Sequence, residues 1–224
     1  QVPLDAACTI LHEVLCGLEQ LHRRQWSTEA RSVAEPRGML PGNLFISFDG
    51  RVCISDFGIA DVEQTMVHNV GGLIKGKSTY MSPEQAGNER MDHRADLFSL
   101  GLCFYELVTL VQPYAGHHVP DVLDAILAGR VPSLRLHRPD APAELEGQLL
   151  RVLDPDPDER YPDASAWRSS LQEIITGNLL PCSADVVARL VQRLFPGAFD
   201  RERDRLEHER LAVMVYMGWD AHDQ

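Results

Sequence analysis

The feature that most constrains the fold is a nearly unbroken apolar stretch in the middle of the chain. It runs from Leu97 to Val111 and is interrupted by Ser99, Glu106 and Thr109. The stretch is too short and too polar to span a bilayer. Residues 96–111 are apolar on nearly every side, which is typical of a helix surrounded by other helices. The sequence therefore predicts a helical lobe built around this segment.

Other segments have the apolar spacing of amphipathic helices and would surround the central one. The clearest is residues 4–22, in which one stripe carries Leu4, Ala7, Cys8, Leu11, Leu15 and Leu18. Asp163 is a candidate N-cap for the helix that follows it. The other predicted helices are residues 120–128, 143–153, 164–175, 184–195 and 199–217.

Two stretches without periodicity, residues 23–43 and 56–91, are predicted loops. Between them lie the short apolar runs Leu44–Ser47 and Val52–Ile54, and the turn between these runs contains an Asp-Gly pair, which indicates a small hairpin. The sum is a mainly α fold of the α+β family with one small β-hairpin. A polar break near residue 176 divides the chain into a lobe, residues 1–176, and a helical C-terminal extension, residues 177–224.

The net charge and the cysteines indicate which kinds of partner and which compartment suit the chain. The formal net charge of −12 opposes general binding to nucleic acid or to anionic membranes, so basic proteins or peptides are the favoured partners. The five cysteines are scattered without a CxxC pair, which favours a reducing, cytoplasmic compartment over a zinc site or a disulfide framework. No secretion signal is recognisable at the start of the chain.

Three short motifs occur in a fixed order. DFG at residues 56–58 follows the second hairpin strand, SPE at residues 82–84 ends the glycine-rich loop, and DLFSLG at residues 96–101 opens the central helix. DFG alone is a weak signal, but the three motifs in this order are a strong one. On these residues the chain resembles bacterial Ser/Thr protein kinases of the eukaryotic type over roughly residues 4–175. The resemblance implies the carboxy-terminal lobe of that fold.

The resemblance also implies roles for single residues. Asp56 matches the aspartate that holds Mg²⁺ between the β- and γ-phosphates of ATP, and Asn43 matches the asparagine that holds a second Mg²⁺. Glu84 and Arg160 match a buried ion pair that ties the activation segment to the lobe. Asp96 matches the aspartate that anchors the backbone of the catalytic loop. The implied activation segment includes Asp56, Phe57, Gly58, Lys77, Thr79, Ser82, Pro83 and Glu84.

The catalytic loop departs from the family pattern H-R-D-x-x-x-x-N. Counting back from Asn43, Arg37 is retained, but Pro36 replaces the histidine and Gly38 replaces the aspartate that serves as catalytic base. Leu40 stands where the family usually has a polar residue or a lysine that contacts the γ-phosphate. Glycine cannot accept the proton of the substrate hydroxyl, and no neighbouring side chain is an obvious substitute. The sequence therefore predicts that no catalytic residue is intact.

Only a few residues precede the first predicted helix. In the family, the glycine-rich phosphate loop and the lysine-bearing strand belong to an amino-terminal lobe, and the sequence predicts that this lobe is absent. Mg²⁺ and ATP are then expected to bind weakly or not at all. Two hypotheses remain: an inactive module that binds a partner, and one piece of a working Ser/Thr kinase whose other lobe is encoded upstream or supplied in trans. A gene or sequence defect across residues 23–42 is a third explanation of the divergent loop.

Residues 71–78 read GGLIKGKS and match the P-loop pattern G-x-x-x-x-G-K-[ST], so a P-loop nucleoside triphosphatase is a rival hypothesis. A P-loop needs a buried strand before it and a helix whose N-terminus meets the phosphates. Residues 61–69 are polar and irregular, and Ser82-Pro83 would interrupt any helix that starts after Ser78. The kinase resemblance explains the same residues as the end of an activation segment, and we favour it.

Three further features have plain interpretations. The hydroxyls of Thr65, Ser78 and Thr79 could carry phosphate near Arg37, but we read them as ordinary loop hydroxyls. Adjacent histidines at residues 117–118 point apart and lack further metal ligands. The alternating aspartates at 154, 156 and 158 lack EF-hand spacing and indicate a solvated turn.

Overall fold

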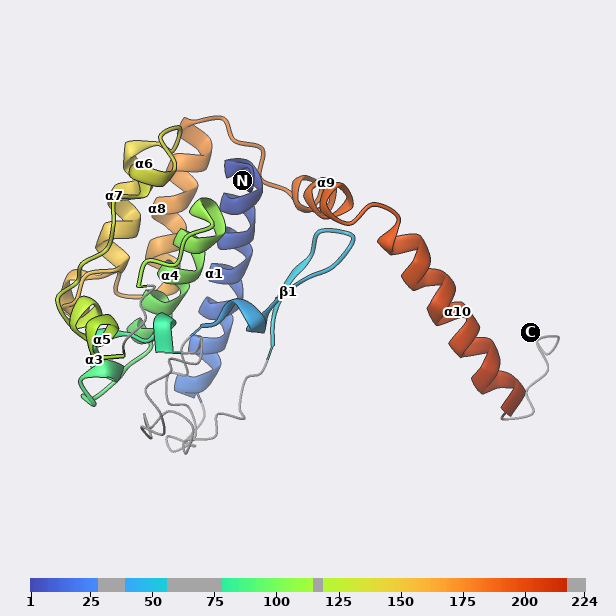
Figure 1. The fold of residues 1–224 in the computed structure, drawn as a ribbon, viewed down its shortest axis with the longest axis horizontal. Coiled ribbons are helices and arrows are strands. Elements are labelled where there is room, and N and C mark those ends of the chain that lie inside the picture. Colours follow the sequence, from blue (N-terminus) through green and yellow to red (C-terminus); the bar gives the residue numbers. More distant parts are fainter. Residues whose placement is uncertain (28–38, 56–77, 115–118, 217–224) are drawn as a thin grey trace.

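The computed structural model of this protein describes residues 1–27, 39–55, 78–114 and 119–216. Within these ranges the chain is mostly helical with one antiparallel pair of strands, which confirms the predicted fold class (Figure 1). The helices and strands are α1 (Leu4–Ser27), β1 (Leu44–Ile46), β2 (Val52–Ile54), α3 (Pro83–Ala86), α4 (Arg94–Thr109), α5 (Val119–Leu127), α6 (Leu134–His137), α7 (Ala143–Val152), α8 (Ala164–Gly177), α9 (Ala184–Leu194) and α10 (Ala198–Tyr216). Three short 3₁₀ turns are η1 (Pro41–Asn43), η2 (Ser78–Tyr80) and η3 (Pro157–Glu159).

Helix α4 is the centre of the lobe and packs against α1, α6 and α7. Thirteen of its 16 residues are buried, so the helix has almost no side that faces solvent, as its sequence predicts. Gly101 lets the end of α7 approach closely. A Cβ atom at Gly101 would lie 2.7 Å from Cγ1 of Val152 and 2.9 Å from Cδ2 of Leu153.

Helix α1 lies between α4, α8 and α9 and also contacts β2. The predicted apolar stripe faces the core: Ala7, Cys8, Leu11, Leu15 and Leu18 are all buried. The helix continues to Ser27, five residues beyond the predicted end, so the start of the predicted loop is helical. Arg23 supports this last turn, because its guanidinium pairs with the Glu19 carboxylate one turn earlier at 2.6 Å.

The hairpin forms as predicted, with Phe45 opposite Cys53 at its middle. Its turn depends on Gly50, whose φ of +81° lies in the left-handed region that residues with a Cβ avoid. Ile54 on β2 rests against α1, where a Cβ at Gly17 would be 3.0 Å from its Cδ1 atom. The hairpin is therefore seated on α1 rather than projecting freely from the lobe.

The C-terminal helices begin on the lobe and lead away from it. Asp163 caps α8, accepting a hydrogen bond from the Ala166 N–H at 2.8 Å, as its position predicts. Helix α9 buries Val187 and Val191 in the same core as α1 and α8. Helix α10 extends away from the lobe (Figure 1). No helix in the described ranges is both long and apolar enough to cross a membrane.

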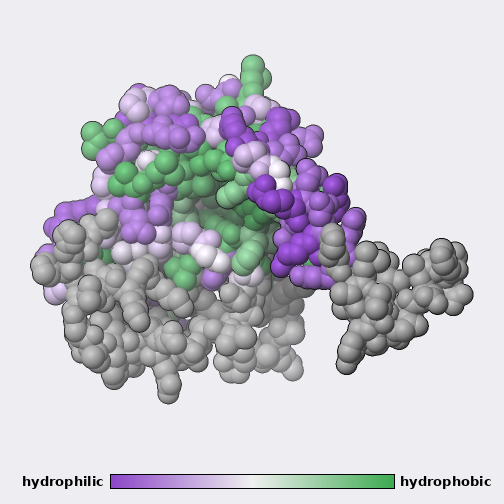
Figure 2. Space-filling model, turned by 45° about the vertical axis from the view of Figure 1, so that its right-hand side comes forward, coloured by the Kyte–Doolittle hydropathy of each residue, from purple (hydrophilic) through white to green (hydrophobic). Residues whose placement is uncertain are grey.

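One face of the molecule is apolar at its centre. Figure 2 shows hydrophobic side chains gathered in a hollow there, with polar surface on either side. Large apolar side chains that are more than one-third exposed include Phe45 and Ile46 on the hairpin. Others lie where α9 meets α10, at Leu194, Phe195 and Phe199.

Candidate functional site

The structure brings together Glu84 and Arg160, which lie 76 residues apart in the sequence. The Nη1 and Nη2 atoms of Arg160 donate to the two carboxylate oxygens of Glu84, each at 2.8 Å. The remaining guanidinium N–H groups donate to the carbonyl oxygens of Arg94, Asp154 and Pro155. The Arg160 side chain is fully buried, and its charge also lies 4.8 Å from the centre of the Phe98 ring.

Glu84 is held in place by the short helix that carries it. Ser82 is the N-cap of α3, and its hydroxyl accepts from the Gln85 N–H at 3.4 Å. The Gln85 side chain accepts in return from the Ser82 N–H at 2.9 Å, which completes a capping box. Pro83 fits the first helical position because its ring fixes a helical φ. The SPE motif is thus a helix start that turns Glu84 toward Arg160.

Sequence reasoning missed a second set of contacts just before this helix. Tyr80 is buried, and its hydroxyl donates to the Glu106 carboxylate and accepts from Nε2 of Gln112, the latter at 2.9 Å. The Ser99 hydroxyl donates to the Tyr80 carbonyl oxygen at 2.8 Å. Burial and the hydrogen bond to Glu106 raise the pKa of the Tyr80 hydroxyl above its ordinary value. These bonds fix residues 78–80 to the central helix.

The base of the hairpin positions Asn43. The Ser55 N–H donates to the Asn43 carbonyl oxygen at 2.9 Å, so the two residues close the open end of the hairpin. The Asn43 side chain is half-buried and forms no hydrogen bond within the described part of the chain. Its amide oxygen is therefore available to a ligand. Asp56, the other predicted metal ligand, directly follows Ser55 and lies outside the described residues, as do Phe57, Gly58 and Lys77.

Of the predicted catalytic loop, the structure describes the residues from Met39 onward. The Cys103 thiol of α4 donates to the Met39 carbonyl oxygen at 3.6 Å, and burial raises the pKa of that thiol, so it remains protonated. Leu40 packs against the apolar core. Pro36, Arg37 and Gly38 lie outside the described residues.

Asp96, predicted to anchor the catalytic loop, lies buried in the first turn of α4. Its Oδ2 atom is 3.3 Å from Nε2 of His22, near the end of α1. The His22 ring in turn meets the His93 ring edge-on at 5.3 Å. The histidine contacts were not predicted, because no local spacing links α1 to α4.

Thr79 and the P-loop-like segment at residues 71–78 lie just before α3 in the sequence. Thr79 is 6% exposed, so its hydroxyl does not face solvent as a loop hydroxyl would. The N-terminal part of the P-loop-like segment lies outside the described residues. From Ser78 the chain forms a three-residue 3₁₀ turn and then α3, without the long helix that a P-loop requires.

In the predicted solvated turn at residues 154–158, Asp156 and Asp158 are exposed, and both make contacts within the protein. Asp156 caps η3 by accepting from the Asp158 N–H at 2.9 Å, and the Asp158 carboxylate pairs with Arg94 at 2.7 Å. Among the described residues no cluster of three His, Cys, Asp or Glu side chains could hold a metal ion. The histidines at residues 117–118 lie outside the described ranges.

A family model of the protein kinase domain matches residues 2–174, and the chain therefore belongs to the protein kinase domain family. The chain is 35% identical over 219 residues to the tyrosine-protein kinase MasK of Myxococcus xanthus, which covers 97% of this chain and 34% of MasK. It is 29% identical over 180 residues to the serine/threonine-protein kinase PknL of Mycobacterium tuberculosis, covering 80% of this chain and 43% of PknL.

A third relative is the serine/threonine-protein kinase PknB of Mycolicibacterium smegmatis, 34% identical over 144 residues, or 63% of this chain and 23% of PknB. These findings confirm the resemblance to bacterial protein kinases of the eukaryotic type. The chain spans less than half the length of each of these three relatives.

Proposed function

We propose that this chain is a kinase-family C-lobe that does not transfer phosphate and acts by binding a protein partner. The observation that carries the proposal is Gly38 at the position of the catalytic base. A positioned base contributes roughly 100- to 10,000-fold to a proton transfer, and glycine has no group that can take the proton. The neighbouring Leu40 packs on the apolar core and offers nothing to a phosphate.

Buried contacts hold the end of the predicted activation segment in a fixed position. The Glu84–Arg160 pair fixes α3, and Tyr80 is bonded to α4. A rigid, shaped surface of this kind suits protein recognition, which depends on pre-organised contacts. With a net charge of −12, the chain favours a basic protein or peptide as the partner and disfavours nucleic acid. Five free thiols fit a cytoplasmic location.

Residual binding of Mg²⁺ and ATP belongs to the same proposal. Asn43 offers an unengaged amide oxygen, and the Asp56 carboxylate would be the second ligand beyond Ser55. Both are oxygen ligands of the type that Mg²⁺ takes, so the residues fit the ion, which would neutralise phosphate charge when bound. Two such ligands alone hold Mg²⁺ weakly, and we expect weak binding.

The second candidate is one piece of a working protein kinase. The Asn43 amide, which has no hydrogen bond within the described part of the chain, favours it, as does the similarity to MasK over 97% of the chain. The relatives are named as tyrosine and as serine/threonine kinases, so the acceptor hydroxyl of this candidate could be of either kind.

The test compares the full chain with its Gly38→Asp variant, using Asp56→Asn as the background control. We expect no transfer from labelled ATP by the unaltered chain, either to itself or to a basic peptide that carries Ser, Thr and Tyr. Thermal shifts with Mg²⁺ and ATP should be small. Transfer by the unaltered chain above the Asp56→Asn background would overturn the proposal in favour of the second candidate. Transfer by Gly38→Asp alone would identify the missing base as the cause of inactivity.

A further inference from the structure

The turn of the β-hairpin is in backbone contact with the C-terminal extension. Gly50 is buried beneath the first turn of α9. A Cβ atom at Gly50 would lie 2.0 Å from the Ala184 carbonyl oxygen and 2.7 Å from the Ala188 nitrogen. Distances this short exclude any side chain. Gly50 thus meets two demands, since the turn needs its positive φ and α9 needs its missing side chain.

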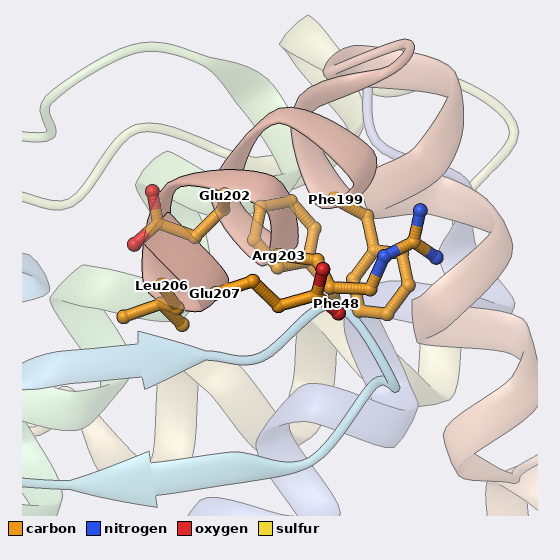
Figure 3. A pocket seen from close by; sticks show the side chains of 6 residues that line it. All are labelled: Phe48, Phe199, Glu202, Arg203, Leu206 and Glu207. Atoms are coloured by element: carbon orange, nitrogen blue, oxygen red, sulfur yellow. The ribbon is translucent and has the colours of Figure 1, made fainter. Parts of the chain in front are cut away.

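Helix α10 makes a second contact with the same turn. The rings of Phe48 and Phe199 meet edge-on with centroids 5.7 Å apart. Figure 3 shows these rings at one end of a groove between the hairpin and α10. The groove is otherwise lined by Glu202, Arg203, Leu206 and Glu207.

The extension that makes these contacts is itself fixed to the lobe. Val187 and Val191 of α9 are buried in the main core, and Val186 and Leu190 form a smaller cluster with Ala6 of α1. Burial of several apolar side chains along one helix is a substantial attachment, because each removes its surface from water. The turn therefore rests on an element that cannot shift without opening this core.

The opposite end of the hairpin carries Asn43, the described residue of the two predicted metal ligands. There the Ser55 N–H donates to the Asn43 carbonyl oxygen, and Asp56 follows Ser55. Between its two ends the hairpin has only three paired positions. A two-stranded hairpin this short is at best marginally stable by itself, so it depends on the elements that hold it in place. If the turn is displaced, the three paired positions are too few to keep the base of the hairpin fixed.

We propose that the C-terminal extension positions Asn43 by clamping the hairpin turn, with Gly50 as the positioning residue. The metal-binding role of Asn43 rests on the proposed function, whereas the clamp does not. The match to MasK supports an integral role for the extension, because an alignment covering 97% of the chain must include most of residues 177–224. Any modification or partner that lifts α9 would then loosen the hairpin.

The test is hydrogen exchange on the full chain without nucleotide, comparing Gly50→Ala with Gly197→Ala. Gly197 also has a positive φ, of +68°, but a Cβ there meets only the terminal Nη1 of Arg201, at 3.2 Å. The control therefore repeats the backbone strain without the clash. The reporter is the Ser55 amide, which closes the hairpin base. In Gly50→Ala it should exchange at least tenfold faster, with the amides of α4 unchanged, while Gly197→Ala should leave it unchanged.

A pair of milder variants covers the case in which Gly50→Ala fails to fold. Phe199→Ala removes the ring that meets Phe48, whereas Phe195→Ala removes a similarly exposed ring without that contact. Faster exchange at Ser55 in Phe199→Ala alone supports the clamp. Equal exchange at Ser55 in both, or faster exchange confined to α9 and α10, overturns it. None of these exchange rates involves ATP, so the clamp and the proposed function can each fail without the other.

Discussion

Each Nη atom of Arg160 lies 2.8 Å from a different carboxylate oxygen of Glu84, with both side chains removed from solvent. The contact ties α3, which carries the SPE motif, to the turn that precedes α8. All five N–H groups of the guanidinium have acceptors, so the desolvation of the charge is fully compensated.

Replacing Arg160 with methionine should destabilise the fold by about 3–5 kcal/mol, because Glu84 would keep a buried charge without a partner. Urea denaturation measures the loss. Arg51→Met is the matched control, since the Arg51–Asp49 pair is exposed, at 78% and 54%, and should leave the free energy of unfolding nearly unchanged. A loss at Arg160 as small as that at Arg51 would show that the buried pair does not hold α3 in place.

Gly101→Ala should destabilise the protein by about 1–3 kcal/mol, since the new methyl group meets Val152 and Leu153 in a packed core. Gly147→Ala is the control within α7. A Cβ there has no neighbour within 4 Å, so the gain in helix propensity should stabilise the protein by about 0.5–1 kcal/mol. Thermal denaturation of both variants checks the opposite signs, and two shifts of the same sign would contradict the close packing of α4 on α7.

The sequence predicted the parts of the fold that depend on local pattern. The apolar stretch at 97–111 identified the central helix, and the Asp-Gly pair identified the hairpin turn. The SPE motif and Arg160 were matched through the family resemblance, and the structure brings Glu84 and Arg160 together. Contacts between distant segments that the resemblance did not imply were not predicted. Tyr80 and Glu106 lie 26 residues apart, and no spacing rule joins a loop tyrosine to a particular helix position.

Gly50 is a second case in which a contact with a distant segment could not be predicted from local sequence. Its place in an Asp-Gly turn was evident from the sequence, but the reason that no side chain fits there lies in α9, more than one hundred residues away. The extent of α1 was also underestimated. Residues 23–27 carry no apolar repeat, and the helix continues on intrinsic propensity and an ion pair between Arg23 and Glu19.

Tyr80→Phe should cost about 1.5–3 kcal/mol, the range for a hydrogen bond to a charged group, because Glu106 and Gln112 lose their shared partner. Tyr114→Phe offers a direct comparison. The Tyr114 hydroxyl is buried and has no hydrogen-bond partner in the described structure, so its removal should be neutral or stabilising. Chemical denaturation at neutral pH distinguishes the two, and equal effects would mean that the Tyr80 hydroxyl contributes no net stability.

The same tyrosines predict a loss of stability in alkali. Burial raises the pKa of Tyr114 to about 12, and the pKa of Tyr80 is also raised, whereas the unfolded chain ionises near pH 10.0. Below pH 10.0 both hydroxyls are protonated in both states, and the stability is fully present. Above it the unfolded state loses protons first, so the free energy of unfolding falls as pH rises. Urea titrations above pH 10.0 should show that the free energy of unfolding falls less steeply with pH in Tyr80→Phe than in the unaltered chain. An equal pH dependence in the two proteins would show that the pKa of Tyr80 is not raised in the folded state.

Leu179 follows α8 with a φ of +50° and a side chain that is 88% exposed. A left-handed conformation costs a residue with a Cβ about 1–2 kcal/mol, and this exposed side chain recovers little of that by packing. Leu179→Gly should therefore stabilise the protein by about 0.5–1 kcal/mol, after the greater entropy of glycine in the unfolded chain is subtracted. Leu179→Ala keeps the Cβ and should give no such gain in thermal denaturation. Equal stabilisation by both variants would show that the exposed leucine, rather than the backbone conformation, is the source of the cost.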